Sequence, residues 1–280
     1  MLTPPPFIRG LSEVFGRYEG FILDLWGVVH DGVAPFPDTI PALSSIKKSG
    51  RKIWLLSNAP RRASVIIEKL TEMGIPRGLY DGIVTSGEAS WQALQESLLG
   101  EWGRRCIHIG SSVRDRSLYE GLDIKLVTDP LHADFVLNSG IEDFSDTLEK
   151  YIPLLEKCRA QNLPMLCANP DKTVHVKEQL VICAGALAAA YEAMGGQVVY
   201  YGKPYRSVYS RCLREMEHSQ VLAVGDSMLT DIAGATGVGL DSVLVTLGIH
   251  REELVGEGPF ESFLARYPYQ PTYIMRSFTW

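Results

Sequence analysis

Three aspartates stand beside two of the most apolar stretches of the chain. Asp24 ends the apolar run that begins at Phe21, and Asp226 ends the one that begins at Val221. Asp231 comes five residues after Asp226, where a helical pattern starts. Two carboxylates on one short loop repel each other, and a hard divalent cation relieves that repulsion. The spacing therefore favours a Mg²⁺ site, because Mg²⁺ binds through a few carboxylates together with water and substrate phosphate.

Each of these aspartates also has a purely structural explanation. An isolated Asp at a strand end commonly caps a helix, and Asp231 at the entrance of a helix could serve only as a cap. The short spacing between Asp226 and Asp231, with glycines on either side, favours the metal site over capping alone.

Two further polar stretches could bind phosphate. Ser57 and Asn58 follow an apolar run and open a helical pattern, and a hydroxyl with backbone N–H groups at a helix N-terminus forms a phosphate site. Lys203, in the sequence Tyr201-Gly-Lys-Pro204, could offset phosphate and carboxylate charge. Taken alone, the first stretch is a helix cap and the lysine a solvated surface group. Both gain weight only together with the aspartates.

Short apolar runs alternate with helix-length segments on either side of these residues. Four runs rich in Ile, Leu and Val are predicted to be buried strands, at Gly20–Leu25, Arg51–Ser57, Val221–Val224 and Ser242–Thr246. Apolar residues recur at helical spacing in Ala63–Met73 and Tyr205–Glu217. This alternation predicts βαβ units and a mainly parallel sheet. Ligands of such sheets bind beyond the carboxyl ends of the strands, so the polar residues are expected at one edge.

The middle of the chain has a complete set of elements of its own. We predict strands and helices at Cys106–Ile109, Asp134–Asn138, Pro164–Ala168, Thr147–Gln161 and Cys183–Met194. Such a stretch can bury its own core, so residues 86–201 are predicted to be an inserted domain between core segments 1–85 and 202–280. Tyr267–Arg276 is expected to add an edge strand, where prolines are tolerated.

Composition excludes several classes of protein. With 46% hydrophobic and 21% charged residues, the chain is an ordinary globular one. A net charge of −6 leaves no basic footprint for nucleic acid or an anionic membrane. Five cysteines without C-x-x-C spacing fit reduced thiols. The first ten residues lack a signal-peptide apolar stretch, and Leu180–Ala190 is too short to span a bilayer. We expect a cytoplasmic protein with no nucleic-acid and no membrane partner.

The four polar stretches, in this order and each at a predicted strand end, resemble the four motifs of the haloacid dehalogenase (HAD) superfamily. The chain most resembles its class IIA branch of p-nitrophenylphosphatase-like and sugar-phosphatase-like proteins, whose cap domain lies between the second and third motifs. Further similar stretches are Thr85–Ala89, Ala168–Asp171 and Ala184–Leu187. The resemblance implies an α/β fold, in which a Rossmann-like HAD core with a parallel sheet carries an inserted α/β C2-type cap domain.

The resemblance also implies a mechanism. Asp24 would attack phosphorus and become an aspartyl-phosphate, which water then hydrolyses. Mg²⁺ would be held by Asp24, the backbone carbonyl of Trp26 and Asp226, with Asp231 supporting the metal shell.

Phosphate binding and specificity follow from the same resemblance. Ser57, Asn58 and Lys203 would hold the phosphate, and Lys203 would also pair with Asp24. Three residues of the cap are expected to set specificity: Asn169, Asp171 and Gly185. The expected partner is a small phosphorylated metabolite, such as a sugar phosphate, and a homodimer through the cap is expected.

Trp26 departs from the family pattern. HAD phosphatases usually carry a second Asp two residues after the nucleophile, which protonates the leaving group, and such help is worth about 10²–10⁴ in rate. Three explanations stay open. His30 or Asp31 could replace the acid, unless they only form a polar turn. The substrate could be an acyl or aryl phosphate with a good leaving group. Alternatively, the protein is catalytically impaired and binds a phosphorylated ligand.

Overall fold

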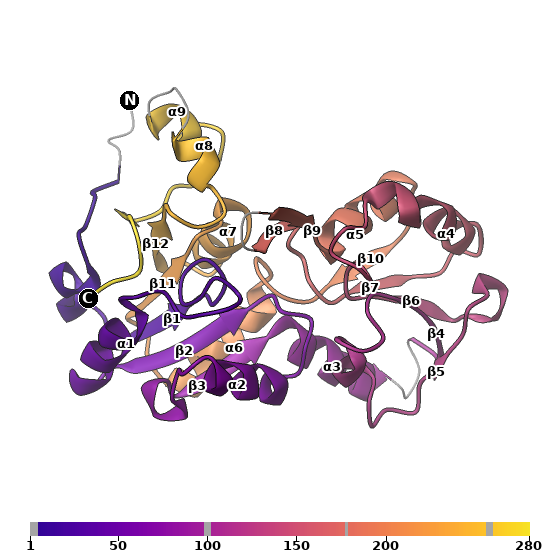
Figure 1. The fold of residues 1–280 in the computed structure, drawn as a ribbon, viewed down its shortest axis with the longest axis horizontal. Helices are drawn as coiled ribbons and strands as arrows, with labels where there is room; N and C mark the ends of the chain where they lie inside the picture. Colours follow the sequence, from indigo (N-terminus) through magenta and orange to yellow (C-terminus); the bar gives the residue numbers. More distant parts are fainter. Residues whose placement is uncertain (1–4, 98–101, 177–178, 256–259) are drawn as a thin grey trace. The chain divides into compact units, whose positions relative to one another are not determined.

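The computed structural model describes residues 5–97, 102–176, 179–255 and 260–280 (Figure 1). The chain forms two compact units. Unit 1 comprises Met1–Ser57, Ile67–Val84 and Pro204–Trp280, and unit 2 comprises Asn58–Ile66 and Thr85–Lys203. Unit 2 therefore includes a short segment, Asn58–Ile66, that the predicted insertion 86–201 leaves out.

Unit 1 is built on a six-stranded sheet in the order β13-β12-β11-β1-β2-β3. Its strands are β1 (Gly20–Leu23), β2 (Lys52–Ser57), β3 (Gly82–Thr85), β11 (Val221–Gly225), β12 (Asp241–Val245) and β13 (Tyr273–Met275). β1 pairs in parallel with β2 and β11, and β12 pairs in parallel with β11 and β13. Every residue of β1 and β11 is buried, as expected for central strands covered on both faces. The parallel sheet and its four predicted strands are confirmed.

Helices flank this sheet. They are α1 (Thr39–Lys48), α2 (Ala63–Glu72), α6 (Arg206–Met216), α7 (Ala233–Gly237), α8 (Arg251–Val255) and α9 (Phe260–Leu264). Both α1 and α6 contact β2. The two predicted helices agree with α2 and α6 to within a residue at each end. The predicted edge strand is also confirmed, since β13 is the last strand of the sheet.

Unit 2 has its own parallel sheet, in the order β10-β7-β6-β4-β5. Its strands are β4 (Arg105–Ile109), β5 (Lys125–Leu126), β6 (Phe135–Asn138), β7 (Met165–Cys167) and β10 (Val198–Tyr200), and its helices are α3 (Ser86–Ser97), α4 (Leu148–Ala160) and α5 (Ala184–Ala193). An antiparallel pair, β8 (Thr173–Val176) and β9 (Gln179–Ile182), completes the unit. The sequence pattern missed β5, β10 and this pair, which are short or partly exposed.

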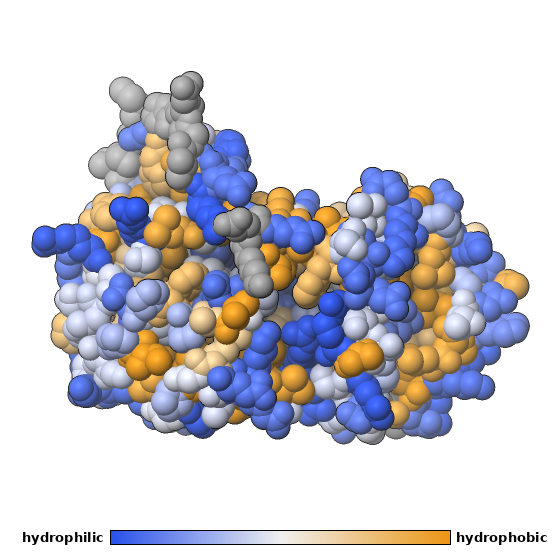
Figure 2. All heavy atoms as spheres, in the orientation of Figure 1, coloured by the Kyte–Doolittle hydropathy of each residue, from blue (hydrophilic) through white to orange (hydrophobic). Residues whose placement is uncertain are grey.

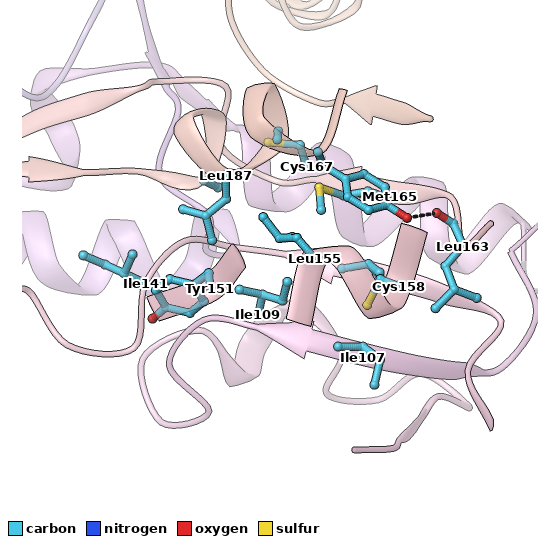
Figure 3. Packing of buried hydrophobic residues seen from close by; sticks show 14 of the residues in the cluster. Ile107, Ile109, Ile141, Tyr151, Leu155, Cys158, Leu163, Met165, Cys167 and Leu187 are labelled. Carbon is cyan, nitrogen blue, oxygen red and sulfur yellow. Dashed lines mark hydrogen bonds between the residues drawn. The ribbon is translucent and has the colours of Figure 1, made fainter. Parts of the chain in front are cut away.

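Successive residues of the unit 2 strands point to opposite faces of the sheet and build two cores. Ile107 and Val136 lie in one cluster with residues of α4 and α5 (Figure 3). Cys106 and Phe135 lie in a second cluster with Leu94 of α3. The unit therefore buries both faces of its sheet, which is why its strands lack polar alternation.

Two sequence expectations concern the surface and the thiols. All five cysteines are free and buried, as predicted for reduced thiols. Within the described ranges, no helix is long and apolar enough to cross a membrane. On the face drawn in Figure 2, hydrophilic and hydrophobic residues are interspersed.

A pair of buried tyrosines tests how hydrogen bonding contributes to stability. The hydroxyl of Tyr80 (2% exposed) has no hydrogen-bond partner in the part of the chain that the structure describes. The hydroxyl of Tyr191 (0% exposed) donates to the carbonyl of Leu163 at 2.7 Å, the bond dashed in Figure 3. We expect Tyr80→Phe to raise the free energy of unfolding by about 1 kcal/mol and Tyr191→Phe to lower it by about 1 kcal/mol. Urea denaturation measures the free energy of unfolding of both variants. Equal destabilisation by the two substitutions would contradict the difference in hydrogen bonding between the two hydroxyls.

Candidate active site

Three carboxylates meet at the carboxyl edge of the unit 1 sheet. Asp24 directly follows β1, and its backbone N–H donates to the carbonyl of Val224 in β11 at 2.9 Å. Asp226 directly follows β11. The candidate ligand oxygens of Asp24, Asp226 and Asp231 all lie within 4.8 Å of one another, and no more than 6% of any of the three residues is exposed. Ser57, the last residue of β2, is also buried and ends the strand on the other side of β1.

The composition of this cluster indicates which cation it fits. Buried carboxylates so close together repel strongly at low effective dielectric, and a bound cation removes that cost. The three side chains offer only oxygen ligands, which suit Mg²⁺, Ca²⁺ or Mn²⁺ better than zinc. The residues present therefore fit a hard divalent cation.

Asp231 is placed by the loop that follows β11. A π-helical segment, η6 (Met228–Ile232), begins after Ser227. The Ser227 N–H donates to Oδ2 of Asp231 at 3.2 Å, and the Asp231 N–H donates to the carbonyl of Ser227 at 3.0 Å. Ser227 caps this segment, because its Oγ accepts the N–H of Thr230 at 3.3 Å. Asp231, for which capping was the structural alternative, is not the cap. Asp231 closes the loop, which holds its carboxylate beside Asp226.

Asp226 is enclosed by backbone that has no room for side chains. A Cβ atom on Gly27 (φ +80°) or on Gly248 would overlap the Asp226 carboxylate. The backbone N–H of Ile249 donates to Oδ2 of Asp226 at 2.7 Å. Glycine is therefore required at these two positions for the chain to approach the carboxylate.

Trp26 is partly buried and packs against its own loop. Its ring meets His30 edge-on, with centroids 5.5 Å apart, and a Cβ on Gly32 would overlap the ring. The Nζ of Lys69, in α2, lies 5.9 Å from the ring centroid. The indole therefore occupies a defined place in the loop, and it has no proton to give at neutral pH.

His30 and Asp31 both hold the turn that follows. The N–H of Gly32 donates to Nδ1 of His30 at 2.9 Å. Burial, reinforced by Lys69, lowers the pKa of His30 to about 4, so the ring is neutral at pH 7. Oδ1 of exposed Asp31 accepts the N–H groups of Val33 and Ala34, both at 2.8 Å, and the bond from Ala34 is the main cause of its lowered pKa. These are the contacts of a polar turn. At neutral pH His30 is uncharged and Asp31 is ionised, so neither can act as a general acid.

In unit 2, Asn58 joins two other predicted site residues. Its Nδ2 donates to Oδ1 of Asp171 at 2.9 Å and to the carbonyl of Lys203 at 3.1 Å, and its Oδ1 accepts the N–H of Lys203 at 2.7 Å. Asn58 and Lys203 are each 3% exposed. Both amide hydrogens of Asn58 are thus engaged within the unit, which leaves its backbone N–H as the group that could meet phosphate.

The three predicted specificity residues share one small region of unit 2. The N–H of Asp171 donates to Oδ1 of Asn169 at 3.0 Å, and the N–H of Gly185 donates to the carbonyl of Asp171 at 3.0 Å. A Cβ on Gly185 would overlap the carbonyl of Pro170. The turn 169–171 therefore packs directly on the first residues of α5.

One part of the site escaped the sequence reasoning. Gly248, Ile249 and His250 approach the Asp226 loop from the end of β12. His250 is buried (6% exposed) and hydrogen-bonded to Glu253. The available signal was position, because the predicted strand Ser242–Thr246 ends at the same edge as Asp226.

Known proteins resemble this chain in sequence and in fold. A model described as haloacid dehalogenase-like hydrolase matches residues 21–125, and a HAD-hydrolase-like model matches residues 200–280. A hydrolase of the haloacid dehalogenase-like family from Brucella suis 1330 has a TM-score of 0.86 and 33% identity, covering 97% of this chain and 100% of that chain. The D-glycerol 3-phosphate phosphatase of Mycobacterium tuberculosis is 26% identical over 267 residues, 94% of this chain and 71% of that protein. A glycerol phosphate phosphatase from M. tuberculosis, crystallised with magnesium, shares the fold with a TM-score of 0.67 at 22% identity, over 95% of this chain and 77% of that chain.

The approach of Gly248 to Asp226 can be tested directly. We expect Gly248→Ala to displace the Asp226 carboxylate and to weaken Mg²⁺ binding by at least about 10-fold. Gly237→Ala is the matched control, since a Cβ there meets nothing within 4 Å. The measurement is the rise in melting temperature with MgCl₂ concentration for both variants and the wild type. Equal Mg²⁺ responses would show that Asp226 does not need this close approach.

Proposed function

The chain belongs to the haloacid dehalogenase-like hydrolases, and we propose that it is a Mg²⁺-dependent phosphatase acting on a small phosphorylated metabolite. The observation that carries the proposal is the buried cluster of Asp24, Asp226 and Asp231 at the carboxyl edge of the parallel sheet. A scaffold would gain nothing from three clustered, mutually repelling carboxylates. A phosphoryl-transfer site needs a nucleophile and a cation in this arrangement.

Asp24, Asp226, the backbone carbonyl of Trp26 and, in support, Asp231 would hold the metal. When bound, Mg²⁺ neutralises the charge of the transferring phosphoryl group. The Ile249 N–H and the Ser227 N–H hold Asp226 and Asp231 in place, so these carboxylates need little rearrangement to act. Such preorganisation is the main way in which a site of fixed dipoles lowers a barrier.

In the proposed reaction an oxygen of Asp24 forms a bond to phosphorus. The bond between phosphorus and the leaving oxygen breaks, and that oxygen departs with the electron pair; a leaving group basic enough to need a proton takes it from water. Water then attacks the aspartyl-phosphate, which releases inorganic phosphate and regenerates Asp24. Two displacements replace one difficult one.

Ser57, Asn58 and Lys203 would hold the phosphate oxygens. The hydroxyl of Ser57 and the backbone N–H of Asn58 lie where β2 ends, and Lys203 adds a positive charge. The hydrogen bonds between Asn58 and the Lys203 backbone support this role, because they fix where the lysine side chain starts. Unit 2 would act as the C2-type cap, with Asn169, Asp171 and Gly185 selecting the substrate. The glycerol phosphate substrate named for the M. tuberculosis relative supports a small metabolite.

Asp24 gives this proposal its first test. We expect phosphate release from a panel of sugar, nucleotide, aryl and acyl phosphates with Mg²⁺, and a loss of at least about 10³-fold in Asp24→Asn, because the amide is not a nucleophile. Chelation with EDTA should abolish turnover, and added Mg²⁺ should restore it. No turnover above the mutant on any substrate would favour the catalytically impaired, ligand-binding alternative.

Trp26, two residues after the proposed nucleophile Asp24, bears on how the leaving group departs.

 With indole at position 26, and with His30 and Asp31 holding a turn, we propose that the preferred substrates are acyl or aryl phosphates, whose leaving groups depart without protonation. The packing of the Trp26 ring against His30 and Gly32 supports this, because the ring fills the loop where an acid would stand.

A leaving-group series tests this preference. We expect wild-type kcat/KM to fall steeply as the pKa of the leaving group rises, by at least about 10²-fold between aryl and alkyl phosphates. Trp26→Asp should raise turnover of the alkyl esters by at least about 10-fold, since it supplies a proton donor. Trp26→Asn is the matched control, because asparagine is equal in size to aspartate but has no acidic proton. A flat wild-type series, or equal effects of the two variants, would contradict the preference.

A further inference from the structure

The segment that follows β12 contacts the Asp226 loop at two points. The Ile249 N–H donates to Oδ2 of Asp226 at 2.7 Å, and the Met228 N–H donates to Nε2 of His250 at 3.1 Å. Met228 is fully buried, and His250 is 6% exposed. We propose that His250 is a positioning residue for the cation site, one that fixes the path of the chain between Asp226 and Asp231. This inference rests on the proposed function, since it assigns a role toward the same metal.

The hydrogen bonds of His250 define its tautomer. Because Nε2 accepts the N–H of Met228, the ring proton is on Nδ1. Nδ1 then donates to Oε1 of Glu253 at 2.7 Å, and Oε2 of Glu253 pairs with Nη1 of Arg266 at 2.8 Å. A chain of contacts therefore runs from Arg266 through Glu253 and His250 to the backbone of the metal loop.

Aromatic packing fixes the orientation of the imidazole. The ring meets Phe263 edge-on at a centroid distance of 5.0 Å and Tyr267 at 6.3 Å. The guanidinium of Arg266 lies 4.7 Å from the centroid of Phe263. A ring held by two hydrogen bonds and two aromatic neighbours presents Nε2 to Met228 in one direction only.

The Met228 N–H matters because of where it lies in the chain. It is the first N–H of η6, and the first N–H groups of a helical turn have no partner within the turn. His250 supplies the missing acceptor. The donor, Met228, lies two residues after Asp226 and three residues before Asp231. Hydrogen bonds that orient metal ligands typically contribute about 10–100-fold to metal affinity, and this one holds the short stretch of chain that joins two of the proposed ligands.

A space-filling role for His250 makes a different prediction. If the imidazole only filled the space beside Phe263 and Tyr267, a phenyl ring would serve as well. If its acceptor positions the loop, a glutamine should serve better, because its Oε1 can take the place of Nε2. Shape and hydrogen bonding can therefore be separated at this one position.

The experiment measures the Mg²⁺ dissociation constant of the full chain by calorimetry, with the melting temperature of the metal-free protein alongside. We expect His250→Phe to weaken Mg²⁺ binding by about 10–100-fold and His250→Gln to stay within about threefold of the wild type. Tyr191→Phe, which removes a buried hydrogen bond of unit 2, is the stability control; it should lower the melting temperature and leave the dissociation constant unchanged. If His250→Phe does not fold, His250→Asn replaces it, because the shorter amide does not reach Met228.

The outcomes distinguish a positioning role of His250 from a space-filling one. Mg²⁺ binding by His250→Phe as tight as the wild type, or by His250→Gln as weak as His250→Phe, would overturn the positioning role while the proposed function stands. A wild-type protein that binds no Mg²⁺ would overturn the proposed metal site itself, and the role of His250 with it.

Discussion

Electrostatic repulsion among three buried carboxylates is the constraint around which unit 1 is arranged. Oxygens of Asp24, Asp226 and Asp231 within 4.8 Å of one another would move apart unless backbone held them. The holding groups come from two directions: the Ser227 N–H on Asp231 and the Ile249 N–H on Asp226. Both donors are backbone groups in the segments that follow β11 and β12, so the carboxyl edge of the sheet keeps the charges together.

The parallel sheet also explains why these residues could be found in the sequence. Central parallel strands are buried on both faces, so β1 and β11 read as unbroken apolar runs. A charged residue at the end of such a run stands out, and parallel strands place their carboxyl ends at one edge. Asp24 and Asp226 were therefore predictable together, and Asp231 followed from its spacing on the same loop.

Other features of the site left little trace in the sequence. The contact of Ile249 with Asp226 uses a backbone N–H, which any residue but proline can supply. His250 acts through Met228, whose side chain takes no part. The partners of Asn58 are 113 and 145 residues away, and no local pattern reveals such pairs. Strand β5, only two residues long and exposed, has no periodicity to detect.

Asn58, for which we propose a role toward phosphate, also forms hydrogen bonds that hold the fold together. The chain first passes from unit 1 to unit 2 between Ser57 and Asn58, and its last return to unit 1 lies between Lys203 and Pro204. The Asn58 amide bonds both the N–H and the carbonyl of Lys203, so one side chain ties together two points where the chain changes unit. Each buried bond of this kind contributes about 1 kcal/mol, and leaving its partner unpaired costs more. Asparagine is suited to this place, since aspartate could not donate to Asp171 and a serine offers one donor where two are used. The residue beside Ser57 is therefore constrained by these hydrogen bonds at two points where the chain changes unit, in addition to the role toward phosphate that we propose for it.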